Sequence, residues 1–468
     1  MPYLKNLASS GATEDFGNWA SEIEFGQIPT EIVENAKLSV LDALGCGLFG
    51  SVQPWGQIAA DVAAAQSPGG STTIWGRRVQ AGVADAAFAN GTAVHGFELD
   101  DVHQLSLMHP GSVTVPAALA MAEKNGVSGR TFLLAVVAGY EVGLRVGSLT
   151  SIPHMLRGYH PTGTVGSICA SVASGKVLDL QPQAMRNAVA IGATQAAGLY
   201  CASKTGAMVK RMHAGRAAQS GVLAALLAER GFTGSVHALE DENGGFMATL
   251  ASGEDLTVRI ADLGHDWETS RVGFKAYAAC ASAHTIIDAL DQMMREGLRA
   301  DQLDTLTIRL SRIGMNNVGW PYQPAGVVSA QMNAQYTAAV KLLDGEVFVD
   351  QFREGRLEDP RTLEMIRRIH VVHDASIDEQ GSHARHATRV SAHLIDGSTK
   401  DAYVEQRRGS SAHPMKRQEI VEKFRKLASK VLEPEIVETL EATVLVLESV
   451  PDMRSVAHLL TTSAAARG

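Results

Sequence analysis

One long stretch of the chain is almost free of charge, and it limits the possible folds more than any other feature. Between Pro161 and Tyr200 only three residues are charged, Lys176, Asp179 and Arg186. Apolar residues recur at helical spacing on both sides of this stretch, and several segments are apolar all round. A helix without a polar face belongs in a protein core or in a subunit interface. The sequence therefore predicts a large helical domain with an extensive buried interior, and a homodimer.

The pattern changes near residue 270, where strand signals begin. Residues 304–310 alternate between polar and apolar types and are rich in β-branched residues, which indicates a strand. The turn pair Asp396-Gly397 lies between two further strand-like runs and predicts a hairpin. An apolar stripe typical of a helix follows residues 407–414, which read as a linker. We therefore predict a mainly α fold in three parts: an all-helical domain in residues 1–269, a smaller α+β domain in residues 270–405, and C-terminal helices in residues 406–468 that return to the helical domain.

Composition indicates which kinds of partner the protein binds and where in the cell it is located. The chain carries 41 Lys and Arg against 50 Asp and Glu, a net charge of −9, which disfavours nucleic-acid binding. We find no apolar run long enough for a membrane span, and residues 1–6 lack the apolar core of a secretory signal. The four cysteines form no Cys-x-x-Cys pair. These features predict a cytoplasmic protein that binds neither nucleic acid nor membrane.

The densest group of titratable residues occupies residues 95–112. Three acids and three histidines fall close together in an otherwise charge-poor region: His95, Glu98, Asp100, Asp101, His103 and His109. Such groups destabilise a fold if they are buried without partners. Three interpretations are open for this segment: proton transfer by histidine or carboxylate, a metal site, and helix capping by Asp100 or Asp101.

Three further clusters carry polar chemistry between apolar helices. His160 lies in a loop bounded by glycine and proline, and Lys210 and His213 lie three residues apart in the basic segment 204–216. Lys275 lies at the boundary between the two predicted domains, where small-molecule sites often form. Each cluster has a plainer interpretation as a turn or a solvated face. Residues 45–50 match G-x-G-x-x-G, but they follow a helical pattern rather than a strand, so we reject a dinucleotide site there.

Taken together and in order, these clusters resemble the MmgE/PrpD family. That family includes 2-methylcitrate dehydratases, cis-aconitate decarboxylases and iminodisuccinate epimerases. The resemblance covers nearly the whole chain and is carried by short motifs in residues 90–95, 100–101, 109–112, 158–162, 210–218 and 343–345. It implies a large helical domain, a smaller α+β lid and a homodimer. It also implies chemistry on small polycarboxylates, without cofactor or metal, in a site between the helical domain and the lid.

The resemblance also implies which side chains form the site. The residues that match catalytic positions are His109, His160, Lys210, His213 and Lys275. The residues expected to bind the substrate or to orient a histidine are Glu98, Asp100, Asp101 and Tyr336. The family often has Asp where Glu98 stands and Thr or Ser where Val102 stands, and these departures bear on the substrate. The Lys210–His213 pattern looks closer to the decarboxylase and epimerase branch than to the longer dehydratases.

The leading hypothesis is a cofactor-free lyase that transfers a proton next to a carboxylate of a small di- or tricarboxylate, as an aconitate decarboxylase or a methylcitrate dehydratase does. An epimerase of an iminodisuccinate-like dicarboxylate is the first alternative. A metal-dependent hydrolase or hydratase is an alternative from another class, and would use His95, Glu98, His103 and His109. A ligand-binding protein without enzymatic activity is the third.

Overall fold

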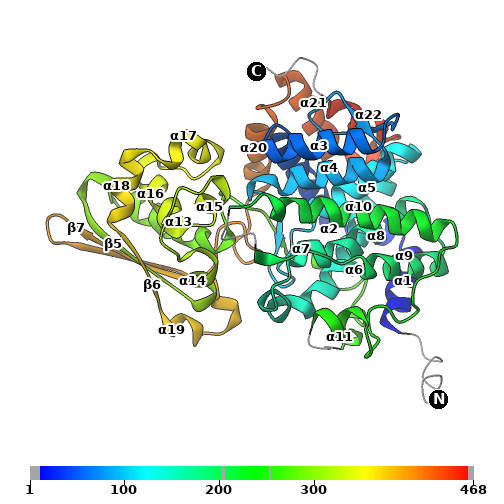
Figure 1. The fold of residues 1–468 in the computed structure, drawn as a ribbon, viewed down its shortest axis with the longest axis horizontal. Helices are drawn as coiled ribbons and strands as arrows, with labels where there is room; N and C mark the ends of the chain where they lie inside the picture. Colours follow the sequence, from blue (N-terminus) through cyan, green and yellow to red (C-terminus); the bar gives the residue numbers. More distant parts are fainter. Residues whose placement is uncertain (1–10, 202–205, 252–254, 462–468) are drawn as a thin grey trace.

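The computed structural model describes residues 11–201, 206–251 and 255–461, which form two bodies joined through an interface (Figure 1). The larger body is helical and contains both ends of the described chain. The smaller body contains a sheet and is formed by residues 281–404. The mainly α fold with a smaller α+β domain is confirmed.

The helical domain is built from helices that pack side by side with little polar surface. Its helices are α1 (Ala12–Glu22), α2 (Thr30–Ser51), α3 (Pro54–Gln66), α4 (Val83–Val94), α5 (Gly111–Asn125), α6 (Gly129–Leu156), α7 (Pro161–Thr164), α8 (Gly166–Val177), α9 (Pro182–Thr194), α10 (Val209–Glu229), α11 (Phe246–Leu250) and α12 (Thr257–Ile260). Two short pairs of strands accompany them: β1 (Thr72–Thr73) with β2 (Gln80–Ala81), and β3 (Val102–His103) with β4 (Val272–Gly273). The G-x-G-x-x-G match lies inside α2, so its rejection as a dinucleotide site agrees with the structure.

The charge-poor stretch forms the centre of this domain. Every residue of α8 is buried, and α8 packs against α5, α6, α9 and α10. Glycines let these helices approach closely: a β-carbon on Gly143 would lie 2.0 Å from Cys169 Sγ, and one on Gly221 would lie 2.3 Å from the β-carbon of Ala170. The prediction that these helices belong in a core is confirmed.

Helix α6 contradicts our prediction that no apolar run is long enough for a membrane span. Residues Gly129–Thr150 of α6 are long and apolar enough to cross a membrane. Inside this fold, 83% of an 18-residue apolar stretch within this run is buried, as in the core helix of a globular domain. We overlooked this run because glycines and a few polar residues interrupt it in the sequence.

The smaller domain is an α+β lid with one four-stranded sheet. Its strands are β5 (Leu303–Leu310), β6 (Ile369–His373), β7 (Thr388–Leu394) and β8 (Thr399–Val404), in the spatial order β6-β5-β7-β8. Only the β5–β6 pair is parallel. Its helices are α13 (Ala281–Arg295), α14 (Arg312–Val318), α15 (Val327–Gln331), α16 (Ala334–Asp344), α17 (Glu354–Leu357), α18 (Pro360–Arg367) and α19 (Ala375–Asp378). Helices α13 and α16 pack together and contact the sheet. The predicted strand and hairpin are both confirmed.

After β8 the chain returns to the helical domain. Helices α20 (Arg417–Ala428) and α21 (Pro434–Leu445) pack on α2, and α22 (Arg454–Leu459) packs on α5 (Figure 1). A buried ion pair between Lys423 and Asp42, 2.6 Å apart, fixes α20 to α2. The connection from the lid is irregular, as the sequence predicts, but its residue Arg407 is buried.

Two contacts hold the segment around the predicted site: one to β4, after which the chain enters the lid, and one to the lid itself. Strand β3 pairs with β4, in register Val102 with Gly273. The side-chain amide of Gln331 donates a hydrogen bond to the Phe97 carbonyl, 2.8 Å away. The segment that carries residues 95–109 is therefore held against the lid side of the molecule.

Candidate active site

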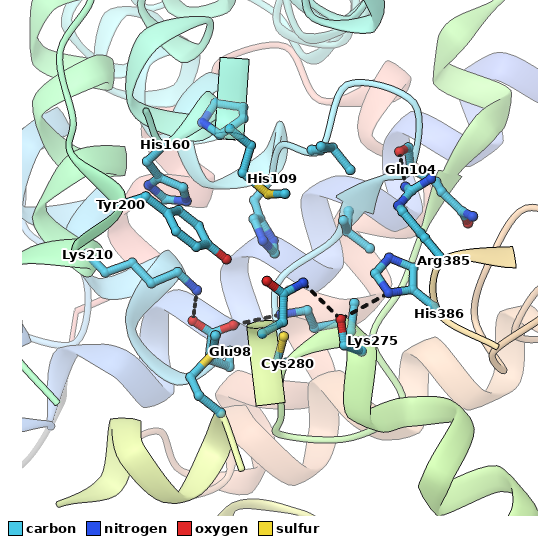
Figure 2. Close-up of a pocket in the computed structure, with 18 of the residues that line it drawn as sticks. Glu98, Gln104, His109, His160, Tyr200, Lys210, Lys275, Cys280, Arg385 and His386 are labelled. Carbon is cyan, nitrogen blue, oxygen red and sulfur yellow. Dashed lines mark hydrogen bonds and ion pairs between the residues drawn. The ribbon is translucent and has the colours of Figure 1, made fainter. Parts of the chain in front are cut away.

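A buried pocket lies where the two domains meet, and most of the predicted site residues line it (Figure 2). Helical-domain elements supply Glu98, His109, His160 and Lys210, and the segment after β4 supplies Lys275. These five side chains are brought together from positions far apart in the chain. The convergence that the sequence clusters predicted is therefore present.

Glu98 bridges the two lysines. The short helix His95–Phe97 ends at Glu98 in the left-handed conformation (φ 56°), an uncommon one for a residue with a side chain. Its Oε1 accepts a hydrogen bond from Lys210 Nζ, and its Oε2 accepts one from Lys275 Nζ at 3.0 Å. Burial alone would raise the pKa of Glu98, but the two ammonium groups hold this pKa well below its usual range. Glu98 is therefore a carboxylate at neutral pH, and it neutralises only one of the two lysine charges.

His109 lines the pocket, and a hydrogen bond fixes its tautomer. Its Nδ1 lies 2.7 Å from the Asp101 backbone carbonyl, which can only accept a hydrogen bond, so Nδ1 carries the proton. Burial, reinforced by Lys275 and opposed by Asp100, lowers the pKa of His109 to about 3. The ring is therefore neutral in the empty pocket, and its Nε2 is free to act as a hydrogen-bond acceptor or base.

His160 shares a hydrogen bond with His213. The two Nδ1 atoms are 3.0 Å apart, so one ring donates and the other accepts. Burial, and after it neighbouring positive charge, lowers the pKa of both rings, that of His213 to about 4. His160 lines the pocket, whereas His213 reaches it only through His160. The structure thus places His213 behind His160, and the tautomer of His213 decides whether His160 Nε2 carries a proton.

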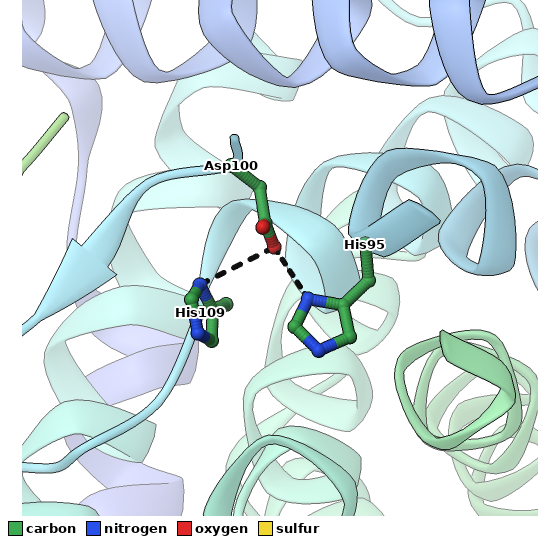
Figure 3. Close-up of side chains that lie close together, drawn as sticks. All are labelled: His95, Asp100 and His109. Carbon is green, nitrogen blue, oxygen red and sulfur yellow. Dashed lines mark hydrogen bonds and ion pairs between the residues drawn. The ribbon is translucent and has the colours of Figure 1, made fainter. Parts of the chain in front are cut away.

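Asp100 lies behind the pocket between two histidines (Figure 3). Its Oδ2 is 2.7 Å from His95 Nδ1 and 3.4 Å from His109 Nδ1. The pKa of Asp100 is lowered, because His109 and His95 outweigh the raising effect of burial. Asp100 therefore orients His109 and does not itself line the pocket.

Two further predicted residues lie away from the pocket. Asp101 accepts hydrogen bonds from the Gly111 backbone N–H, 2.9 Å away, and from Tyr140 Oη, 2.8 Å away, so it caps the start of α5. Tyr336 is buried inside the lid and donates its hydroxyl proton to the Gln351 carbonyl at 2.5 Å. Neither lines the pocket, so neither lies where it could touch a substrate there, although the Asp101 backbone carbonyl orients His109. The capping interpretation of the 95–112 segment applies to Asp101.

The metal alternative needs a different set of ligands from the one we predicted. His103 Nε2 lies 2.9 Å from Glu268 Oε2, and Glu98 is held by the two lysines. Among the described residues, the group that could hold a cation is His95, Asp100 and His109, whose ligand atoms lie within 4.8 Å of one another. The same geometry is that of a carboxylate hydrogen-bonded to His95 with His109 close by, and His109 already donates its Nδ1 proton to the Asp101 carbonyl.

Sequence reasoning missed several side chains that line the pocket. They are Gln104, Tyr200, Ser282, Asn317, Arg385, His386 and Arg407. Arg407 lay in a segment we interpreted as a linker. The run His383-Ala384-Arg385-His386 before a strand was a signal we did not use, and Ser282 lies in the boundary segment that also carries Lys275. Of the basic segment 204–216, Lys204 and Thr205 lie outside the described residues.

Comparisons with known proteins show which family the sequence matches. The family model described as the MmgE/PrpD N-terminal domain matches residues 14–259, and that of the MmgE/PrpD C-terminal domain matches residues 277–449. A cis-aconitate decarboxylase-like protein of Aspergillus oryzae is 34% identical and covers 98% of this chain and 99% of its own length. A cis-aconitate decarboxylase of Aspergillus terreus is 31% identical, over 97% and 96%. A mitochondrial 2-methylcitrate dehydratase of Yarrowia lipolytica is 23% identical, over 74% and 70%.

Proposed function

Because the chain belongs to the MmgE/PrpD family, we propose that it is a lyase that decarboxylates cis-aconitate without a cofactor. The observation that carries this proposal is the meeting of Lys210, Lys275, His109 and His160 in one buried pocket lined by a single carboxylate. Two relatives similar over nearly their whole length carry the names cis-aconitate decarboxylase or decarboxylase-like, whereas the named dehydratase is more distant and matches over less of its length.

The pocket residues suit the charge changes of this reaction. When the carboxylate on the CH₂ carbon of cis-aconitate leaves as carbon dioxide, its C–C bonding pair forms a new double bond to the central carbon. The old π pair moves to the far CH carbon, which takes up one proton. Negative charge therefore spreads over the remaining carbons and carboxylates. Lys210 and Lys275 meet that charge in a water-poor site, where fixed cations are most effective.

We assign the proton transfer to His160. His109 presents an unprotonated Nε2, because its Nδ1 proton is held by the Asp101 carbonyl. The imidazoles are neutral because burial and nearby positive charge disfavour a further proton. A substrate with three carboxylates brings negative charge close to His160 and so favours its protonation when substrate binds. The imidazolium then gives its proton to the substrate carbon and returns to the neutral ring. His213 positions His160 through the 3.0 Å contact.

We also propose a cytoplasmic homodimer. The outward face of α10 exposes apolar side chains at helical spacing: Val209 (39% exposed), Met212 (40%), Leu223 (37%) and Leu227 (38%). A second copy of the chain is the occupant we propose for this face, since exposed apolar patches of this kind mark interfaces. Light scattering tests the dimer.

The test of the reaction is incubation with cis-aconitate in deuterated water, followed by nuclear magnetic resonance. Decarboxylation predicts release of carbon dioxide, a product with a new =CH₂ group and one deuterium on the former CH carbon. Parallel incubations with 2-methylcitrate and with iminodisuccinate test the dehydratase and epimerase alternatives. Unchanged cis-aconitate beside turnover of either of the others would reject the proposal. Lys210→Ala is the matched inactive control.

A further inference from the structure

Two buried guanidinium groups on the lid side of the pocket form no ion pair with a described residue, and the Asp288 carboxylate acts on one of them, Arg407, only from beyond ion-pair distance. Arg385 follows the short helix Ser382–Ala384 and is 8% exposed, and Arg407 follows β8 and is 3% exposed. Both line the pocket. Across residues 11–201, 206–251 and 255–461, the structure pairs neither of them with a carboxylate. A buried charge destabilises a fold unless something pairs with it, so these two arginines call for an anion.

Their hydrogen-bonding capacity is also incompletely used. Arg385 Nη2 donates to the Gln104 carbonyl at 2.5 Å, and its Nη1 donates to the Ser382 carbonyl at 3.2 Å. Arg385 Nε and Arg407 Nη1 are buried and have no acceptor among the described residues. Buried N–H groups without an acceptor are rare in folded proteins. Burial lowers the pKa of both guanidinium groups to about 10, which leaves them charged at neutral pH.

The pocket therefore carries uncompensated positive charge at both ends. Among the described residues, four cations line it, Lys210, Lys275, Arg385 and Arg407, and they face one lining carboxylate, Glu98. With the histidines neutral, these lining side chains carry three positive charges in excess, and Asp100 and Asp288 act on them from behind the pocket wall. Figure 2 shows Arg385 and His386 on the side opposite Lys210 and His160. An anion that satisfies both ends must carry carboxylates at both ends.

We propose that Arg385 and Arg407 form a second anion subsite, which binds the substrate carboxylate farthest from Lys210 and selects tricarboxylates over dicarboxylates. The inference rests on the proposed function in that the substrate is a small polycarboxylate. A planar guanidinium binds a carboxylate through two parallel hydrogen bonds, which gives geometric selection as well as attraction. Because Arg385 also bonds to the Gln104 carbonyl of the helical domain, the subsite is complete only when the lid is closed.

The test compares two unreactive ligands by isothermal titration calorimetry. Propane-1,2,3-tricarboxylate has the carbon frame of cis-aconitate without its double bond, and methylsuccinate has one terminal carboxylate replaced by hydrogen. We expect wild type to bind the tricarboxylate at least about tenfold more tightly than methylsuccinate. Arg407→Met and Arg385→Met are expected to weaken tricarboxylate binding by about tenfold to a hundredfold, the scale of charge-assisted hydrogen bonds, and methylsuccinate binding by less than about threefold.

Controls separate a binding role from a structural one. Arg389→Met removes a lid arginine that is partly exposed and paired with Asp374, and it is expected to leave both affinities unchanged. Arg407→Lys keeps the charge without the planar fork and is expected to retain part of the selectivity; it also serves if Arg407→Met does not fold. Without ligand, Arg407→Met is expected to melt at the wild-type temperature or above, because it removes an unpaired buried charge.

The outcomes distinguish the subsite from the reaction. Equal losses for both ligands, or no loss for either, would overturn the subsite. Carbon dioxide release from cis-aconitate is measured in the same preparations. Wild type that prefers the tricarboxylate but releases no carbon dioxide would reject the proposed reaction and support the subsite. Normal turnover with unchanged tricarboxylate affinity in both arginine variants would reject the subsite alone.

Discussion

Replacing Glu98 by Gln removes the carboxylate that holds two buried lysines. Lys210 and Lys275 both donate to Glu98, and all three side chains are at most 8% exposed. In Glu98→Gln the amide oxygen accepts one hydrogen bond, but no negative charge remains between the ammonium groups. Breaking a buried ion pair by removing one partner destabilises a protein by about 3–5 kcal/mol. We expect the empty variant to lose stability on that scale.

A substrate-like anion should return much of this stability. A ligand at a hundred times its dissociation constant stabilises the folded state by about 2.7 kcal/mol. Propane-1,2,3-tricarboxylate brings carboxylates to the lysines, and in Glu98→Gln it does so without competing with the Glu98 side chain. We therefore expect the ligand to raise the denaturation midpoint of the variant more than that of wild type.

Urea denaturation, followed by tryptophan fluorescence and circular dichroism with and without the tricarboxylate, measures both effects. The matched control is Glu14→Gln, which breaks the more exposed Arg186–Glu14 pair at 3.2 Å and should change stability by less than about 1 kcal/mol. If Glu98→Gln without ligand unfolds at the wild-type urea concentration, the two lysines do not depend on Glu98 and the reasoning is refuted.

Four further predictions follow from the site and the proposed dimer. His160→Ala and Lys210→Ala should fold as wild type and lose about a hundredfold or more in kcat/KM for cis-aconitate, the usual scale for acid–base groups and charge-stabilising donors; wild-type turnover in either would remove that residue from the chemistry. The pKa of His109 is lowered to about 3 and that of His213 to about 4, so between these values and about pH 6.5 the two rings bind protons only when the chain unfolds. The free energy of unfolding should therefore be unaffected by these rings above pH 6.5 and should fall by roughly 1.4 kcal/mol per pH unit per ring as the pH drops toward 4. His109→Asn should flatten this dependence of stability on pH, and an unchanged slope would contradict the assignment. Dialysis against a chelator should leave turnover unchanged, and elemental analysis that finds stoichiometric metal together with lost activity would favour the metal alternative. Leu223→Asp should convert the dimer to a monomer in light scattering, and a dimer that persists would move the interface away from α10.

Much of this fold could be predicted because its strongest signals are local. The nearly uncharged α8, whose one charged residue is Lys176, could only be buried, and the alternation in residues 304–310 could only form a strand with one buried face. Titratable residues in an apolar setting likewise identified Glu98, His109, His160, Lys210 and Lys275, all of which line the pocket. The resemblance to a family put these clusters into one site, which spacing alone does not do.

The parts that could not be predicted depend on three-dimensional contacts. Asp101 and Asp100 are neighbours in the chain, but the backbone turns between them, so that one caps α5 and the other supports two histidines. Arg407 looks like a solvated residue of a linker, and only the return of the chain from β8 to α20 buries it against the pocket. Tyr336 lies at a helix start like many binding residues, yet its hydroxyl is used by the Gln351 carbonyl.

Because two bodies share the pocket wall, the substrate specificity of such a protein can change without a change in its chemistry. His160, to which we assign the proton transfer, belongs to the larger body, and the arginines proposed to select the substrate by its length and charge belong to the smaller body and to the segment that leaves it. Substitutions around Arg385 and Arg407 can therefore retune which acid is accepted while the imidazole chemistry stays as it is. A new specificity for this scaffold should be sought by varying the sheet-bearing half, with the helical half kept constant.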